Sequence, residues 1–173
     1  MLTVYTIGHS TRTADEFLAL LHAYGVTQLA DIRTVPRSRH NPQFGREILP
    51  ATLHQAGIDY VYLAALGGLR HGTPSDRNAG WRNASFHAYA DYMQTPEFAA
   101  GITELMELAG AATMAIMCAE AVPWRCHRSL VGDALLVRGV RVRDIMSATR
   151  APEHQLTSFA RVDGTTITYP ADS

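Results

Sequence analysis

A continuously apolar run, ATMAIMC at 112–118, most limits the folds available to this chain of 173 residues. A short run without any charge is typical of a strand that is buried on both faces, as at the centre of a parallel sheet. Helical and strand patterns alternate on both sides of the run, with short connections between them. The alternation predicts an α/β fold: a single domain with a mostly parallel β-sheet of about five strands, flanked by helices.

Turn and cap signals give the expected element boundaries. Thr13 and Glu16 have the spacing of a capping box, and Gly25 predicts the end of the helix that they begin. Further helices are expected around 46–56, from Ser85, from Thr95-Pro96-Glu97 and over 130–138, and strands at 2–7, 27–33, 59–66, 112–118 and 140–146.

The last part of the chain has weaker patterns. The stretch 152–160 is interpreted as a short helix, and 160–169 as a hairpin that turns at Asp163-Gly164. We therefore expect an α/β domain over 1–147 and a C-terminal extension over 148–173 that packs on the same domain.

Composition narrows the function classes. The net charge of −1 gives no overall reason to expect nucleic acid or an anionic membrane as a partner. The N-terminus lacks the pattern of a signal peptide, and no apolar run has the roughly 20 residues of a membrane helix, so we expect a cytoplasmic protein without a membrane partner. Two cysteines are too few for a disulfide framework, which leaves free thiols, ligands, catalytic groups or small buried side chains.

Polar and glycine residues follow four of the predicted strands. Right-handed crossovers make successive strands parallel, so the residues after each strand meet at one edge of the sheet, where ligands of open α/β sheets bind. The residues expected at this edge are Gly8, His9 and Ser10, then Asp31, Arg33, Arg37 and Arg39, then Gly67, Gly68 and Arg70, and finally the stretch 118–128.

Several motifs in order resemble a known family. They are YTIGHST, DIRTVPRSRHNPQF, LGGLR, GW, YADYM and IMCAEAVPWRCHRSL, and they extend over roughly residues 4–146. Together they are similar to the domain of unknown function 488 (DUF488) family. The resemblance implies a small bacterial or archaeal α/β domain and assigns no reaction.

The stretch CAEAVPWRCHRSL at 118–130 holds both cysteines. A cysteine at a strand end, an arginine-bearing loop and a helix N-terminus together form an anion cradle in several thiol enzymes. Arg125 falls seven positions after Cys118, which is one more than a phosphatase-type loop requires. Both a catalytic and a structural Cys118 are therefore considered, with Glu120 as a second candidate for the chemistry.

Cys126, His127 and Arg128 are adjacent near the predicted start of a helix, where successive residues are about 100° apart, so at most two are expected to face one ligand. His127 would serve as a base and Arg128 as an anion fork, or the three would form an ordinary helix entrance. A metal site from these residues with Cys118, Glu120 and His9 lacks the usual CxxC or HxxxH spacing, and no metal is expected.

The other candidates have plain structural alternatives. Asp31 and Arg33 form either a structural ion pair or, with Arg37 and Arg39, part of a phosphate site. Ser10 is interpreted as a helix cap or a backbone anchor, because GHST lacks the G-x-S-x-G nucleophile pattern. The polar loop at 67–83 is a candidate lid, and Trp81 and Trp124 are the aromatic residues expected near the site.

The leading hypothesis is a small enzyme that acts by hydrolysis or group transfer on an anionic, nucleotide- or nucleic-acid-related substrate. The alternatives are a non-catalytic module that binds a phosphate ligand or nucleic acid, and a metal-binding or redox protein that uses Cys118, Cys126 and His127. The sequence identifies no cofactor and no oligomeric state. The candidate catalytic residues are Cys118, Glu120, His9 and His127, and the candidate binding residues are Gly8, Ser10, Asp31, Arg33, Arg37, Arg39, Gly67, Gly68, Arg70, Trp81, Arg125, Cys126 and Arg128.

Overall fold

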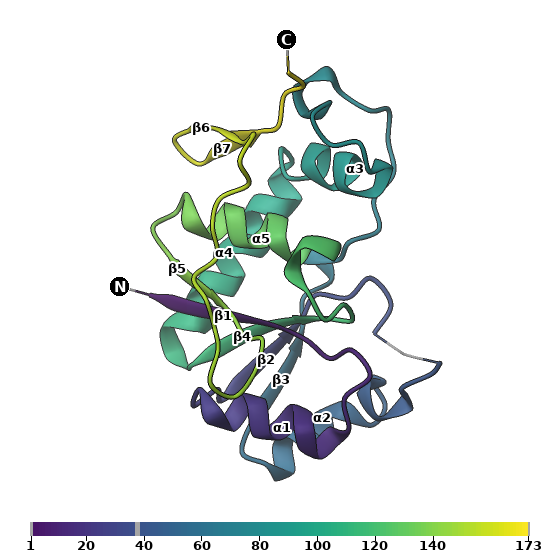
Figure 1. Ribbon diagram of the computed structural model, residues 1–173, viewed down its shortest axis with the longest axis vertical. Coiled ribbons are helices and arrows are strands. Elements are labelled where there is room, and N and C mark those ends of the chain that lie inside the picture. The colour runs from purple at the N-terminus through teal and green to yellow at the C-terminus, as the bar shows by residue number, and fades with distance from the viewer. Residues whose placement is uncertain (1, 37–38, 173) are drawn as a thin grey trace.

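The computed structural model of the protein describes residues 2–36 and 39–172 and contains a five-stranded sheet whose strands are all parallel (Figure 1). Strand β4 lies at the centre, between β1 and β2, and all of its residues are buried. The predicted α/β single domain is confirmed, and ATMAIMC supplies the central strand. The strands in spatial order are β3 (Asp59–Tyr62), β2 (Gln28–Asp31), β4 (Met114–Cys118), β1 (Thr3–Gly8) and β5 (Arg141–Asp144).

Helices cover both faces of the sheet. Helices α1 (Ala14–Ala23) and α2 (Leu49–Gln55) lie on one face, and α3 (Ala84–Tyr92), α4 (Pro96–Ala111) and α5 (Arg128–Leu136) lie on the other (Figure 1). In the part of the chain that the structure describes, no helix has the length and apolar character needed to cross a bilayer.

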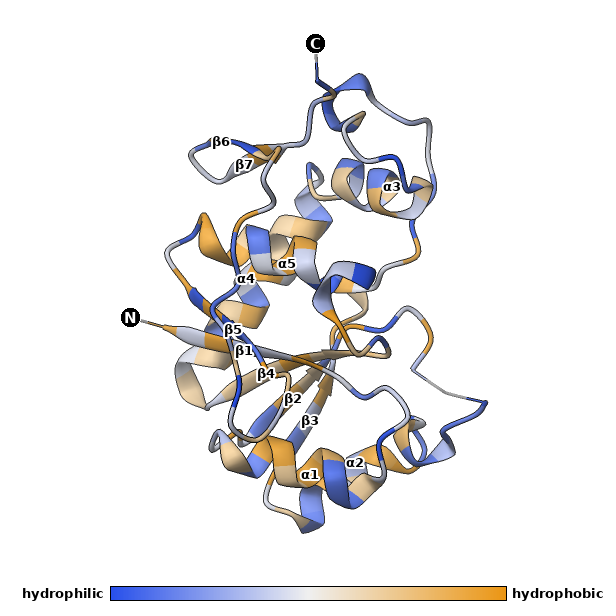
Figure 2. Ribbon diagram, in the orientation of Figure 1, coloured by the Kyte–Doolittle hydropathy of each residue, from blue (hydrophilic) through white to orange (hydrophobic). Residues whose placement is uncertain are grey.

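The two faces of β4 belong to two separate hydrophobic clusters. Met114 and Ile116 join the cluster under α4 and α5, whereas Ala115 and Met117 join the one under α1 and α2. The alternation follows from the two-residue period of a strand, and it explains why the run must be apolar at every position. Figure 2 shows the matching apolar colouring on the strands and on the helices beside them.

The helix boundaries follow the cap signals. The Thr13 side chain accepts a hydrogen bond from the Glu16 amide, and the Glu16 carboxylate accepts one from the Thr13 amide, so the capping box is present. Gly25, just past the end of α1, has a positive φ of 68°. Thr95 caps α4 and is followed by Pro96 in the first turn.

Two predicted elements differ in the structure. Strand β3 ends at Tyr62, and Ala64–Leu66 forms a 3₁₀ turn in place of the predicted end of the strand. The predicted short helix at 152–160 is wrong, because the first part of this segment is extended beside the edge strand β5 and its end, 157–160, forms a turn. The His154 amide donates to the Val142 carbonyl, so a backbone partner across the sheet edge replaces the helical one. The predicted hairpin is confirmed as β6 (Arg161–Asp163) and β7 (Thr166–Thr168).

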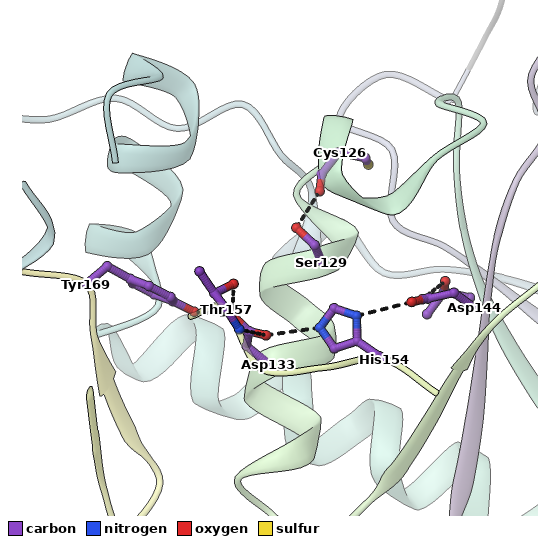
Figure 3. Close-up of polar contacts among 8 residues, drawn as sticks. Cys126, Ser129, Asp133, Asp144, His154, Thr157 and Tyr169 are labelled. Carbon is purple, nitrogen blue, oxygen red and sulfur yellow. Dashed lines mark hydrogen bonds and ion pairs between the residues drawn. The ribbon is translucent and has the colours of Figure 1, made fainter. Parts of the chain in front are cut away.

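A buried ionic cluster attaches the segment after β5 to the body of the domain (Figure 3). His154 Nε2 lies 3.0 Å from Asp133 Oδ1 on α5, and His154 Nδ1 lies 3.2 Å from Asp144 Oδ2 on β5. Asp133 also accepts hydrogen bonds from the hydroxyls of Thr157 and Tyr169. Four segments between residues 133 and 169 are therefore joined through two carboxylates.

The cluster changes the protonation of its histidine. Burial alone would lower the pKa of His154, but the hydrogen bonds and charges of Asp133 and Asp144 outweigh burial and raise the pKa to about 9. His154 is therefore an imidazolium in the folded protein at neutral pH, and the two carboxylates stabilise that charge.

The cluster predicts a loss of stability in mild alkali. In the folded protein the pKa of His154 is above its ordinary value of 6.5. The contribution of protonated His154 to the free energy of unfolding is therefore fully present below about pH 6.5 and is lost as the pH rises through about 9. The pKa shift corresponds to roughly 3 kcal/mol of stability. Urea unfolding of the wild type and of His154→Gln between pH 6 and pH 10 measures this as the pH-dependent difference between the two proteins. His71→Gln, a change at an exposed histidine, is the control. Parallel pH profiles for the wild type and His154→Gln would contradict the prediction.

Candidate functional site

A pocket of about 340 Å³ opens at the carboxyl ends of β2 and β4. These neighbouring strands lead to helices on opposite faces of the sheet, since α2 follows β2 and α5 follows β4. Such a reversal separates the two outgoing chains and creates the crevice in which open α/β sheets bind ligands. The lining residues are Arg33, Thr34, Val35, Gly68, Leu69, Ser85, Phe86, Cys118, Ala119, Glu120, Arg125, Cys126 and His127.

A buried arginine lies beside this pocket. Arg128 is fully buried at the start of α5, and its Nη1 lies 3.3 Å from Cys118 Sγ and 2.9 Å from the carbonyl oxygen of Glu120. Its Nη2 donates to the carbonyl of Ala121 at 3.2 Å. No carboxylate of the described residues forms an ion pair with Arg128, and its Nε has no hydrogen-bond partner among them. A buried cation requires an anion, and the Cys118 sulfur is the ionisable group that it contacts.

The two cysteines differ in acidity. Burial opposes ionisation of Cys118, but the hydrogen bond with Cys126 and the charge of Arg128 outweigh it and lower the pKa of the Cys118 thiol. Burial and the adjacent Cys118 raise the pKa of the Cys126 thiol. Both cysteines are free. The pair therefore ionises first at Cys118, with Cys126 as a protonated neighbour.

Two glycines permit the close packing around the pair. A Cβ on Gly8 would lie 1.6 Å from the carbonyl oxygen of Glu120, and a Cβ on Gly68 would lie 2.5 Å from Nδ1 of His127. No side chain fits at either distance. Gly67 is less constrained, because its Cβ would lie 3.2 Å from the carbonyl oxygen of Ala64. Gly8 thus brings the end of β1 against the loop that follows β4.

His127 is a neutral acceptor in the pocket wall. Its Nε2 lies 2.9 Å from the carbonyl oxygen of Ile32, and since a carbonyl only accepts, Nε2 carries the hydrogen. Its Nδ1 lies 3.5 Å from Cys126 Sγ. Burial lowers the pKa of His127 to about 4, so the ring is neutral at physiological pH.

His9 supports the site without lining the pocket. Its ring stacks on Phe44 at 4.5 Å between centroids, and its Nδ1 donates to the carbonyl of Ser10 at 2.8 Å. Its Nε2 faces the guanidinium of Arg33 at 3.5 Å. Burial lowers the pKa of His9, which leaves a neutral ring that positions Arg33.

Ser10 is a backbone anchor. Its amide donates to the carbonyl of Ala119 at 2.9 Å, and its φ of 49° is a strained conformation for a residue that is not glycine. Thr13, and not Ser10, caps α1. The backbone of the first loop is therefore fixed to the loop that follows Cys118.

Asp31 and Arg33 form a buried bidentate ion pair. Nε and Nη2 of Arg33 lie 2.9 and 2.7 Å from the two carboxylate oxygens of Asp31, and the Tyr60 hydroxyl donates to the same carboxylate at 2.5 Å. Arg33 also lines the pocket. Its charge is compensated by Asp31, so Arg33 offers a fixed donor to the pocket and little net charge.

Other predicted binding residues lie elsewhere. Arg70 donates to the carbonyls of Gly67 and Ala64, and its guanidinium lies 3.6 Å from the ring centroid of Tyr92, outside the pocket. Arg39 is exposed and does not line the pocket. Arg37 lies outside the described residues.

The two tryptophans are not in this pocket. Trp81 packs against Phe86, Phe159 and Tyr169, with ring centroids 4.9–5.5 Å apart, and together with Trp124 it lines a different pocket. The sequence placed them near the site because both are close in sequence to glycine-rich or cysteine-bearing loops. Phe86, in the first turn of α3, lines the pocket of Cys118 and also packs against the hydrophobic core.

The expectation that at most two residues of CHR face one ligand agrees with the structure. Cys126 and His127 line the pocket, whereas Arg128 is buried beside it and contacts Cys118. Helix α5 begins at Arg128, and Cys126 is extended, with φ −138° and ψ 146°. The angular spacing of a helix therefore does not apply to Cys126.

Arg12 is a contact that the sequence did not indicate. It donates to the carbonyl of Gly8, and burial together with the nearby Arg128 charge lowers its pKa. The available signal for Arg12 was its position in GHSTR, two residues after Gly8, His9 and Ser10, which were expected at the edge of the sheet. Within residues 2–36 and 39–172, no group of three or more His, Cys, Asp or Glu residues is arranged to hold a metal.

The fold and the pocket define an α/β protein with a cysteine and arginine pair at the carboxyl edge of its sheet. The chain belongs to the family described as Domain of unknown function DUF488, whose sequence profile matches residues 13–135, more than half of the chain. No curated protein matches the chain, and no solved structure matches it.

The contact at Gly8 predicts a severe effect of one methyl group. Gly8→Ala should lower the free energy of unfolding by about 3 kcal/mol or more, because the added Cβ would overlap the carbonyl oxygen of Glu120. The matched control is Gly110→Ala in α4, where nothing lies within 4 Å of the added Cβ and where alanine should stabilise the helix by roughly 0.5–1 kcal/mol. Urea unfolding compares the two, and equal stabilities would contradict the close contact.

Proposed function

We propose that the protein is a small enzyme that performs hydrolysis or group transfer on an anionic, nucleotide- or nucleic-acid-related substrate, with Cys118 as the nucleophile. One observation carries the proposal: the fully buried Arg128 guanidinium has no carboxylate partner among the described residues and donates to Cys118 Sγ at 3.3 Å. A fixed cation stabilises the thiolate, which is the reactive form of cysteine.

The anionic substrate class is supported by the charges at the pocket. Arg125 is exposed, lines the pocket and forms no ion pair with a described residue, so its guanidinium is available to a phosphate or carboxylate. Arg33 adds donors in a fixed orientation. Phe86 offers an aromatic ring to a base in the same pocket.

The reaction would have two steps. The Cys118 thiolate forms a bond to the electrophilic atom of the substrate, and the bond to the leaving group breaks, so that the leaving group departs with the electron pair. Water, or an acceptor hydroxyl in group transfer, then attacks the enzyme-bound group and restores the thiolate. The proton of that water or hydroxyl passes to the carboxylate of Glu120, which lines the pocket, and from there to the leaving group or to solvent. His127 is neutral and hydrogen-bonded to Ile32, so it positions the Cys126 thiol and carries no charge in either step.

A pair of alkylating reagents tests both the thiolate and the anion preference. Iodoacetate and iodoacetamide form the same kind of thioether but differ by one negative charge. The ratio of their rates at Cys118 should exceed the ratio for free cysteine by at least about tenfold, because cations near the thiolate attract the charged reagent. Mass spectrometry identifies the labelled cysteine, and Arg125→Ala should lower the ratio.

The controls separate this outcome from general thiol reactivity. Cys126→Ser should retain the labelling of Cys118, Cys118→Ser should abolish it, and Arg161→Ala, a change at an exposed arginine outside the pocket, should leave the ratio unchanged. The proposal of a thiol nucleophile fails if Cys126 is labelled first or if the ratio equals that of free cysteine.

A non-catalytic anion-binding module is the second candidate function. It is favoured by the low exposure of Cys118, 2%, and by the neutral, hydrogen-bonded states of both His9 and His127. It predicts that a 5′-phosphorylated oligonucleotide binds without turnover, more weakly as salt is raised and more weakly to Arg125→Ala. Calorimetric titrations at two salt concentrations measure this, and salt-independent binding would count against it.

A further inference from the structure

A second and larger pocket, of about 540 Å³, lies between the segment that follows β5 and the segment that leads into α5. Its volume is within the range of roughly 300–1,000 Å³ in which proteins bind small molecules. Apolar side chains supply much of its wall, among them Trp81, Pro123, Trp124, Met146 and Pro152.

One segment of the chain separates this pocket from the pocket of about 340 Å³ that Cys118 and Cys126 line, called the thiol pocket below. Pro123, Trp124 and Ser129 line the larger pocket, whereas three of the four residues between Trp124 and Ser129, 125–127, line the thiol pocket. The Ser129 hydroxyl donates to the carbonyl of Cys126 at 3.0 Å, which ties the two sides of the wall together (Figure 3). The two pockets are therefore distinct and are separated by the same stretch of chain.

The indole of Trp81 has an unpaired hydrogen-bond donor. Its ring packs edge-to-face with Phe86 and Phe159 and in a tilted arrangement with Tyr169, which fixes its orientation. Its Nε1–H is buried and has no hydrogen-bond partner among the described residues. Buried donors are almost always paired, because an unpaired one loses its hydrogen bond to water without replacement. A ligand acceptor that pairs with this N–H would recover that free energy.

Trp124 adds an aromatic platform. Its side chain is 66% exposed, although the indole is large and apolar. It lies on the 3₁₀ turn Pro123–Arg125 and lines the pocket. An exposed tryptophan beside an apolar pocket is suited to stacking on a planar ring.

One unpaired charge of the lining is available to an anion. Arg150 is exposed and forms no ion pair with a described residue, whereas His154 is paired with Asp133 and Asp144. Asp144 is the carboxylate of the lining, and both of its oxygens are engaged, by Thr6 and by His154. Asp133 contacts His154 but does not line the pocket. Arg150 is thus the charge available to a ligand.

We propose that this pocket binds a planar aromatic or heteroaromatic molecule that carries a hydrogen-bond acceptor and one anionic group, a phosphate or a carboxylate. The ring stacks on Trp124, the acceptor takes the Trp81 Nε1–H, and the anionic group pairs with Arg150. The site is independent of the thiol chemistry proposed above, because no residue lines both pockets.

The chain reports on this pocket through its own fluorescence, since its two tryptophans are both in the lining. The probes are adenosine 5′-monophosphate and nicotinate, which both carry a ring nitrogen acceptor and one anionic group, with adenosine as the uncharged ring and inorganic phosphate as the charge without a ring. Adenosine 5′-monophosphate or nicotinate should quench saturably and bind at least about tenfold more tightly than either partial probe. Which of the two anionic probes binds distinguishes a phosphate from a carboxylate ligand.

Variants followed by calorimetry locate the binding. Arg150→Gln should weaken the anionic probe by about tenfold, and Trp81→Phe, which keeps an aromatic ring and removes the donor, by roughly threefold to tenfold. Cys118→Ser, Arg125→Ala and the surface control Arg161→Gln should leave the affinity unchanged. Loss of binding in Arg125→Ala would place the ligand in the thiol pocket and overturn the proposal. So would the absence of saturable binding by both anionic probes up to about 10 mM.

Discussion

The contacts of the buried Arg128 guanidinium determine the geometry at the carboxyl edge of the sheet. The guanidinium contacts Cys118 at the end of the central strand and the carbonyls of Glu120 and Ala121 in the loop that follows. An isolated charge in the interior is costly, so the loop carbonyls and the Cys118 sulfur converge on the guanidinium of Arg128. Gly8 completes the arrangement by admitting the Glu120 carbonyl against β1. The acidity of Cys118 and the course of the loop therefore have one physical cause.

The stretch between Cys118 and α5 lies between two pockets with different lining residues. One side presents Arg125, Cys126 and His127 to the pocket at the sheet edge, and the other presents Trp124 and Ser129 to the larger pocket. Because the 3₁₀ turn and the extended Cys126 interrupt helical geometry, neighbouring residues can serve opposite sides. The hydrogen bond from the Ser129 hydroxyl to the Cys126 carbonyl fixes the backbone between the two pockets.

Local signals predicted most of the fold. The capping box at Thr13, the proline after Thr95 and the apolar run of β4 each depend on neighbours within a few residues, and each has the predicted structure. The segment at 152–160 was mispredicted because its backbone partner, Val142, lies on another strand. Local propensity has no information about an edge strand that offers free carbonyls.

The sequence by itself determined that this chain forms a parallel α/β sheet and which residues follow its strands, because period, caps and crossover handedness are local or general properties. Only the tertiary structure decided which of those residues meet. The order that places β4 between β2 and β1 brings Arg33 into the pocket of Cys118, while Arg70 turns to Tyr92 and Trp81 to Phe159. The pKa values of Cys118 and His154 also depend on contacts made by folding. Each shift requires that the side chain is buried and that its charged or hydrogen-bonding partner lies within a few ångströms.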